Sequence, residues 1–75
     1  MRRLRTNGIY KPPGIVRPVY ARPSGGGYLL YDFEHGPRLP PRFVVSSDGR
    51  VLNWHGEEVG WTIDGLEDTG ETARI

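Results

Sequence analysis

The chain has 75 residues, a formal net charge of +1 and no cysteine, and it contains 11 glycines and 7 prolines. A chain of this length forms one small domain, and without cysteine it has no disulfide and no thiol redox chemistry. Two histidines without cysteine are a poor ligand set for structural zinc, so we expect no metal site and no cofactor. No apolar run is long enough to cross a membrane or to act as a signal peptide, so we expect no membrane partner and a cytoplasmic location.

Charge is distributed unevenly along the chain. Residues 1–22 contain six basic residues and no acid, whereas residues 23–75 contain four arginines and nine acids, for a net charge of −5. Such a split bears on partners and association rather than on fold, and it could attract one subunit to another. We predict three parts: a basic N-terminal arm over residues 1–14, a single β domain over residues 15–64, and an acidic, flexible tail over residues 65–75.

The first two predicted strands form a hairpin. They span residues 15–21 and 28–33, and a glycine-rich loop joins them. Pro18 removes a backbone donor, which places the first strand at a sheet edge or bulge. A proline-rich connector follows at residues 34–41. The side chains that share the predicted core side of the second strand are Leu29, Tyr31 and Phe33.

The run from residue 42 to residue 63 predicts a three-stranded meander with two tight turns. Asp48-Gly49 favours a two-residue hairpin turn, because both central residues of a type I′ turn have positive φ. His55-Gly56 favours a second turn of the same kind.

These two turns predict the register of the meander. Closing them pairs Val45 with Leu52 and Leu52 with Val59, and a slip of one residue would exchange the two faces. Gly60, inside the last strand, predicts a bulge or a sharp bend. The predicted buried face comprises Phe43, Val45, Leu52, Trp54, Val59, Trp61 and Ile63.

We therefore predict an all-β fold with five strands. The N-terminal hairpin and the C-terminal meander would curl into a small barrel or half-open barrel, Src-homology-3-like in architecture, which reduces exposed sheet edges. About a dozen large apolar side chains make a small core, so we expect a surface between subunits to add stability.

The leading function predicted from the sequence is protein–protein association by a non-enzymatic β module. The partner would be another protein or a further copy of the chain, as a homo-oligomer. The predicted interaction surface lies on the face opposite the core and comprises Val44, Val51 and Thr62.

Nucleic-acid binding by the basic arm is the first alternative. Three arginines within the first five residues can pair with phosphates, and nearby tyrosines can stack on bases. The candidate nucleic-acid contacts are Arg2, Arg3, Arg5, Lys11, Arg17 and Tyr20.

A small oligomeric enzyme with a site shared between subunits is the second alternative. Asp32, Glu34 and His35 cluster after a predicted strand, and such groups can serve acid–base chemistry when their geometry allows it. The sequence contains no nucleophile elbow, phosphate loop or zinc signature. We therefore assign no catalytic residue and expect the protein not to be an enzyme.

Overall fold

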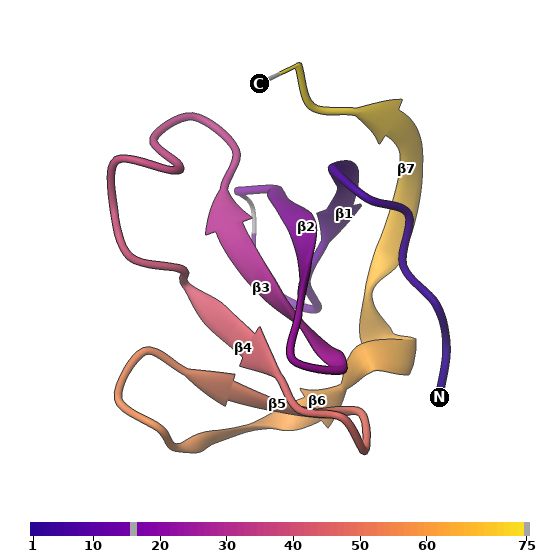
Figure 1. Cartoon of the computed structure of the whole chain (residues 1–75), viewed down its shortest axis with the longest axis vertical. Helices are drawn as coiled ribbons and strands as arrows, with labels where there is room; N and C mark the ends of the chain where they lie inside the picture. The colour runs from indigo at the N-terminus through magenta and orange to yellow at the C-terminus, as the bar shows by residue number, and fades with distance from the viewer. Residues whose placement is uncertain (16, 75) are drawn as a thin grey trace.

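The computed structural model describes residues 1–15 and 17–74, and within them the chain forms seven strands and one short 3-10 helix, η1 (Ile63–Gly65). The strands are β1 (Gly8–Lys11), β2 (Val19–Ser24), β3 (Gly27–Asp32), β4 (Phe43–Val45), β5 (Arg50–Asn53), β6 (Glu58–Thr62) and β7 (Glu67–Thr72). They pair antiparallel in the order β6-β5-β4-β3-β2-β1-β7, and this sheet curls into a half-barrel (Figure 1). The all-β prediction is confirmed, but seven strands replace the five expected, and the Src-homology-3-like architecture is not confirmed. Among the residues described, no helix has the length and apolarity needed for a membrane crossing.

Both ends of the chain contribute a strand to this sheet. β1 lies between β2 and β7, with Tyr10 opposite Asp68 (Figure 1). Leu4 before β1 and Leu66 before β7 are buried. The sheet thus includes residues from the N-terminal segment 1–14, from residues 15–64 and from the C-terminal segment 65–74.

The first predicted hairpin is present, with its faces reversed. Gly25 and Gly26 have φ values of 55° and 83° and form a two-residue turn between β2 and β3. Leu30 lies opposite the buried Ala21 and shares its burial. The even-numbered residues of β3 therefore face the core. The predicted core positions Leu29, Tyr31 and Phe33 were wrong, since they lie on the outer side.

The two turns of the meander are one residue longer than predicted. In the first, the Gly49 N–H donates to the Ser46 carbonyl at 3.0 Å, and the Ser46 N–H donates to the Arg50 carbonyl at 2.9 Å. The second turn repeats this pattern between Asn53 and Glu57. Each loop has three residues and ends in a glycine with positive φ, the arrangement in which a type I turn is followed by a glycine bulge.

The longer turns shift the register by one residue and exchange the two faces of β5. Val45 pairs with Val51, and Val44 pairs with Leu52. Val51 is only 1% exposed and belongs to the core, whereas Trp54 is 58% exposed. The predictions that Leu52 and Trp54 are buried and that Val51 faces outward were therefore wrong.

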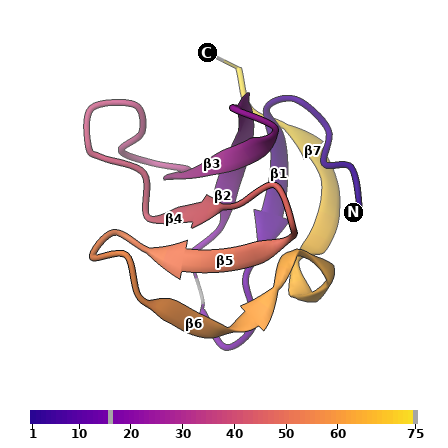
Figure 2. The same ribbon diagram turned by 60° about the horizontal axis from the view of Figure 1, so that its bottom comes forward.

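The last strand of the meander agrees with the sequence. Gly60 has a φ of 85°, and the pairing of β5 with β6 changes register along this part of β6, which confirms the predicted bulge. Val59 and Trp61 pack against the core, and the Trp61 ring meets the Phe43 ring edge-to-face at 5.2 Å. Ile63 is buried in η1, which turns the chain from β6 to β7 (Figure 2).

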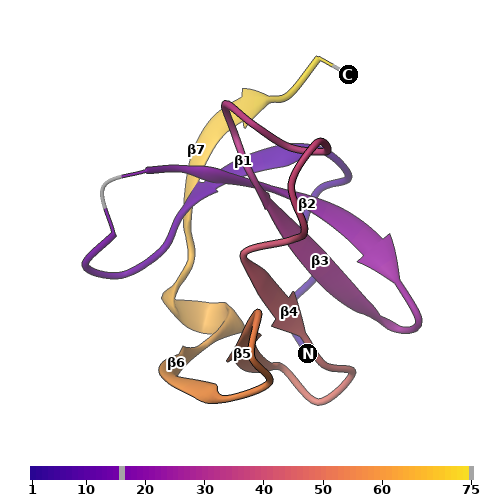
Figure 3. The same cartoon turned by 90° about the vertical axis from the view of Figure 1, so that its left-hand side faces the viewer.

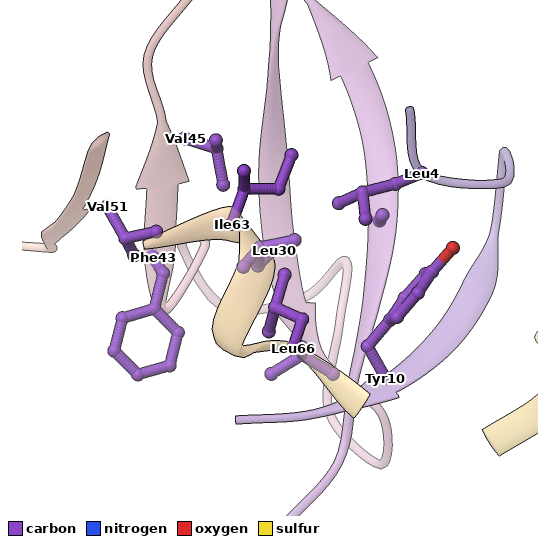
Figure 4. Close-up of a cluster of buried hydrophobic side chains, with 10 residues drawn as sticks. Leu4, Tyr10, Leu30, Phe43, Val45, Val51, Ile63 and Leu66 are labelled. Atoms are coloured by element: carbon purple, nitrogen blue, oxygen red, sulfur yellow. The ribbon is translucent and has the colours of Figure 1, made fainter. Parts of the chain in front are cut away.

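The core fills the inner side of the half-barrel. Side chains from β1 to β5, from η1 and from the two chain ends meet there (Figure 4). The buried cluster comprises Leu4, Tyr10, Val19, Ala21, Leu30, Phe43, Val45, Val51, Ile63 and Leu66.

Candidate interaction surface

Arg5, one of the predicted nucleic-acid contacts, is held by β7. Its Nη2 and Nε donate to the Asp68 carboxylate at 2.6 and 3.1 Å, and its other contacts are Thr72 Oγ1 and the Glu71 carbonyl. The hydrogen bond from Arg5 holds the pKa of Asp68 below its ordinary value, helped by the backbone N–H of Gly70. The Arg5 guanidinium is therefore already paired with a carboxylate at the position where the predicted contact with nucleic acid would require a phosphate.

Arg2 is engaged in a similar way with the other end of the chain. Its Nη1 donates to the carbonyls of Ile63 and Leu66 at 3.0 and 2.6 Å. Its guanidinium also lies 5.6 Å from the centre of the Tyr10 ring. Arg2 therefore connects the N-terminal segment to both sides of η1.

Arg17 and Tyr20 lie away from these arginines. Arg17 reaches Asp32 at 3.4 Å and Glu34 at 3.3 Å. Tyr20 is 1% exposed, its ring stacks on Tyr31 at 5.5 Å, and burial raises the pKa of its hydroxyl. A side chain so buried cannot stack on a base.

Arg3, Lys11 and Arg17 are the exposed members of the predicted nucleic-acid set, and of these Arg3 and Lys11 form no ion pair within residues 1–15 and 17–74. Lys11 lies opposite Glu67 in the β1–β7 pair. The basic and acidic parts of the sequence are thus adjacent within one molecule, so they neutralise each other there. Any attraction between subunits would therefore depend on charges away from the two chain ends.

The predicted interaction residues do not form one surface. Val44 is half-buried on the outer face of β4, Val51 points into the core, and Thr62 is exposed on the edge strand β6. The outer positions that the sequence did not identify are Leu29 and Leu52, which lie beside Val44 because the faces of β3 and β5 are the reverse of those predicted.

A continuous row of side chains crosses the outer face of five strands. Successive cross-strand pairs join Arg22 to Leu29, Leu29 to Val44, Val44 to Leu52, and Leu52 to Glu58. Directly opposed residues of an antiparallel pair point to the same face. We call these five residues the outer row. Its three central aliphatic side chains are half-buried, and its charged ends are exposed. Figure 3 turns this side of the half-barrel, with β3 and β4, toward the viewer.

The connector between β3 and β4 covers the outer face beside this row. A Cβ atom at Gly36 would lie 2.6 Å from the Tyr31 Cβ and 2.8 Å from the Tyr20 hydroxyl, so the connector packs directly against these two tyrosines. The connector and the β5–β6 turn leave the sheet at the same end, where β3 ends, β4 begins and β5 ends. The large exposed apolar side chains in these two loops are Phe33, Leu39 and Trp54.

The two edges of the sheet are poorly suited to accept a further strand. Gly60 in β6 and Gly70 in β7 have φ values of 85° and 82°, which interrupt a regular extended edge. In β7 the Asp68 carboxylate accepts the Gly70 N–H at 2.8 Å, and the Thr69 hydroxyl accepts the Glu71 N–H at 3.2 Å. Contact through the outer face is therefore favoured over contact through an edge.

The predicted acid–base cluster has a structural role. Asp32 is buried, lies 3.4 Å from Arg17 and 3.5 Å from Arg42, and accepts the backbone N–H of His35 at 3.1 Å. These contacts fix the start of the connector to the sheet. In residues 1–15 and 17–74, no three histidine or acidic side chains come together as a metal site would require.

Comparison of this chain with protein-family models, with curated proteins and with solved structures found no match.

Proposed function

We propose that this protein is a non-enzymatic β module that acts by protein–protein association, including self-association, through the outer row. The observation that carries this proposal is the cross-strand line of Leu29, Val44 and Leu52, three partly exposed aliphatic side chains on one face. Contiguous apolar side chains on a surface are typical of interaction sites, whereas isolated ones are common everywhere.

The surroundings of the row support this proposal. Trp54 is 58% exposed and follows Leu52 by two residues. Tryptophan is enriched among the residues that dominate binding energy, and it loses little conformational freedom when it is buried. Charged residues at the two ends of the row would supply the polar rim of such a contact.

The experiment is sedimentation equilibrium of the full chain over micromolar to millimolar concentrations. We expect a dimer or larger species for the natural sequence and a monomer for Val44→Asp, because the new carboxylate would be buried without a partner. The matched control is Thr6→Asp, which adds the same charge at an exposed position before β1. A natural chain that stays monomeric throughout this range would overturn the proposal, and association that survives Val44→Asp would move it to another surface.

Nucleic-acid binding by the basic N-terminal residues is the alternative. It rests on Arg3 and Lys11, which are exposed and form no ion pair within residues 1–15 and 17–74. It predicts that single- or double-stranded probes are retarded at low salt and that the affinity falls steeply as salt rises. Loss of retardation in Arg3→Ala would support this alternative, and an absence of retardation at low salt would remove it.

A further inference from the structure

We infer that the partner of the outer row is a second copy of this chain, stacked face to face about a two-fold axis that runs parallel to β4. This inference rests on the proposed function and specifies the partner and its orientation. The charge pattern of the row is the observation that points to it.

The row has opposite charges at its two ends and a nearly symmetric apolar centre. It begins with Arg22, continues through Leu29, Val44 and Leu52, and ends with Glu58. A two-fold axis parallel to β4 reverses the order of the row in the second copy. Arg22 then faces the partner's Glu58, Leu29 faces the partner's Leu52, and Val44 faces the same residue of the partner. Such an interface is isologous, because each contact occurs twice.

The charges also select this axis over the other in-plane axis. An axis perpendicular to the strands would preserve the order of the row. Arg22 would then face the partner's Arg22, and Glu58 would face the partner's Glu58. Like charges opposed in this way disfavour association, whereas the reversed row opposes unlike charges.

Both charged ends are available for such contacts. Within residues 1–15 and 17–74, Arg22 forms no ion pair. Glu58 lies 3.6 Å from Arg50, and both side chains are more than 60% exposed. Exposed ion pairs are weak, so Glu58 can also meet a second arginine.

The same axis brings the exposed apolar loops together. Rotation about an axis parallel to the strands leaves the connector end of one sheet next to the connector end of the other. Trp54 then lies on the side of the partner's connector, which carries Leu39. Both side chains are more than half exposed in the single chain, and each gains an apolar neighbour in the dimer.

The size of the molecule limits the strength of this contact. The chain measures 27 × 26 × 23 Å, so one broad face covers roughly 700 Å², compared with about 800 Å² per partner in a standard stable interface. The outer face of a half-barrel is convex, so the aliphatic centre of the row makes the closest contact, and the charges of Arg22 and Glu58 act on those of the partner across a wider gap. We therefore expect a transient dimer with a dissociation constant in the micromolar range.

The test is a charge exchange measured by sedimentation equilibrium on the full chain. We expect R22E and E58R each to weaken the dimer by about tenfold or more, because each variant opposes like charges at two symmetry-related places. The double variant R22E/E58R restores unlike charges and should return to within about threefold of the natural chain. Matched controls are R3E and E71R, which make the same charge changes at exposed positions outside the row.

The outcomes separate this inference from the proposed function. If V44D abolishes the dimer but R22E and E58R leave it unchanged, association through this face stands and the two-fold arrangement is wrong. If both single exchanges weaken the dimer and the double variant does not restore it, the pairing of Arg22 with the partner's Glu58 is also wrong. If the natural chain is monomeric up to millimolar concentration, the proposed function fails and this inference fails with it. Thermal unfolding of each variant checks that the fold is intact.

Discussion

The two ends of the chain and the central meander are held in place by different kinds of contact. Arg2 and Arg5 attach the N-terminal segment to carbonyl and carboxylate groups that lie 61 to 66 residues away in sequence. The meander is closed by hydrogen bonds between residues at most four apart, within its turns at Gly49 and Gly56. The ends therefore depend on distant partners and on charge, whereas the meander depends on local turn geometry.

The largest expected effect tests whether the C-terminal end belongs to the core. Leu66 is 2% exposed and lies in the buried cluster. We expect Leu66→Ala to lower the free energy of unfolding by about 2–4 kcal/mol, through lost burial and the cavity that remains. Denaturant unfolding measures this change. Leu39→Ala, at an exposed leucine in the connector, should stay within about 0.5 kcal/mol of the natural chain. Equal stability of the two variants would mean that the C-terminal end is an appendage.

A smaller effect tests the register of the meander. Val51→Ala removes two buried methyl groups and should cost about 2 kcal/mol, whereas Leu52→Ala, on the outer face, should cost less than about 1 kcal/mol. Denaturant unfolding of the two variants, at a concentration where the chain is monomeric, shows directly which substitution lowers the free energy of unfolding more. The two-residue turns first expected would reverse this order.

The smallest expected effect is a change in the pKa of one carboxyl group in each region, Asp68 at the chain ends and Asp48 in a turn of the meander. The pKa of Asp68 is lowered chiefly by Arg5, and that of Asp48 chiefly by the Ser46 hydroxyl. We expect Arg5→Gln to raise the pKa of Asp68 toward its ordinary value and to leave Asp48 unchanged, as measured by NMR titration of the two carboxyl groups. Ser46→Ala should raise the pKa of Asp48 toward its ordinary value and leave that of Asp68 unchanged. A change at both sites in either variant would contradict the separation of the two regions.

The lowered pKa of Asp68 makes the stability of the chain depend on pH in a defined direction. A carboxyl group whose pKa is lowered by folding contributes stability above its unfolded pKa, and this stability is lost as pH falls through the folded pKa. The unfolding temperature should therefore fall more steeply on acidification below about pH 4 in the natural chain than in Arg5→Gln. Asp64→Asn, which removes a nearby exposed carboxylate, is the control.

Local signals in the sequence were sufficient to predict the all-β class and the bend at Gly60, but they did not determine the length of the two meander turns. Asp48-Gly49 fits both a two-residue loop and the last two positions of a three-residue loop. The three-residue loop needs positive φ only at the glycine, and Asn7 is the only non-glycine residue with positive φ in the part of the chain that the structure describes. The longer loop therefore avoids strain at Asp48 and His55, and this choice decided the faces of β5 and the composition of the outer row.

The faces of β3 and the chain ends could not be predicted from local pattern either. Both sides of β3 are apolar, and the side that is buried was decided by Val19 and Ala21 across the hairpin. β7 contains no large apolar residue, and its place in the sheet depends on β1 and on Arg5. Two members of the outer row, Leu29 and Leu52, were missed because of these reversed faces.

The glycine bulges at the two sheet edges also set an upper limit on assembly. A contact made by a face about a two-fold axis is satisfied by two copies, and neither copy then offers a regular edge on which a third could grow. Growth into fibres needs such an edge, repeated from one molecule to the next. If two copies associate through the outer row about the proposed two-fold axis, assembly should therefore end at a closed pair, even at high protein concentration.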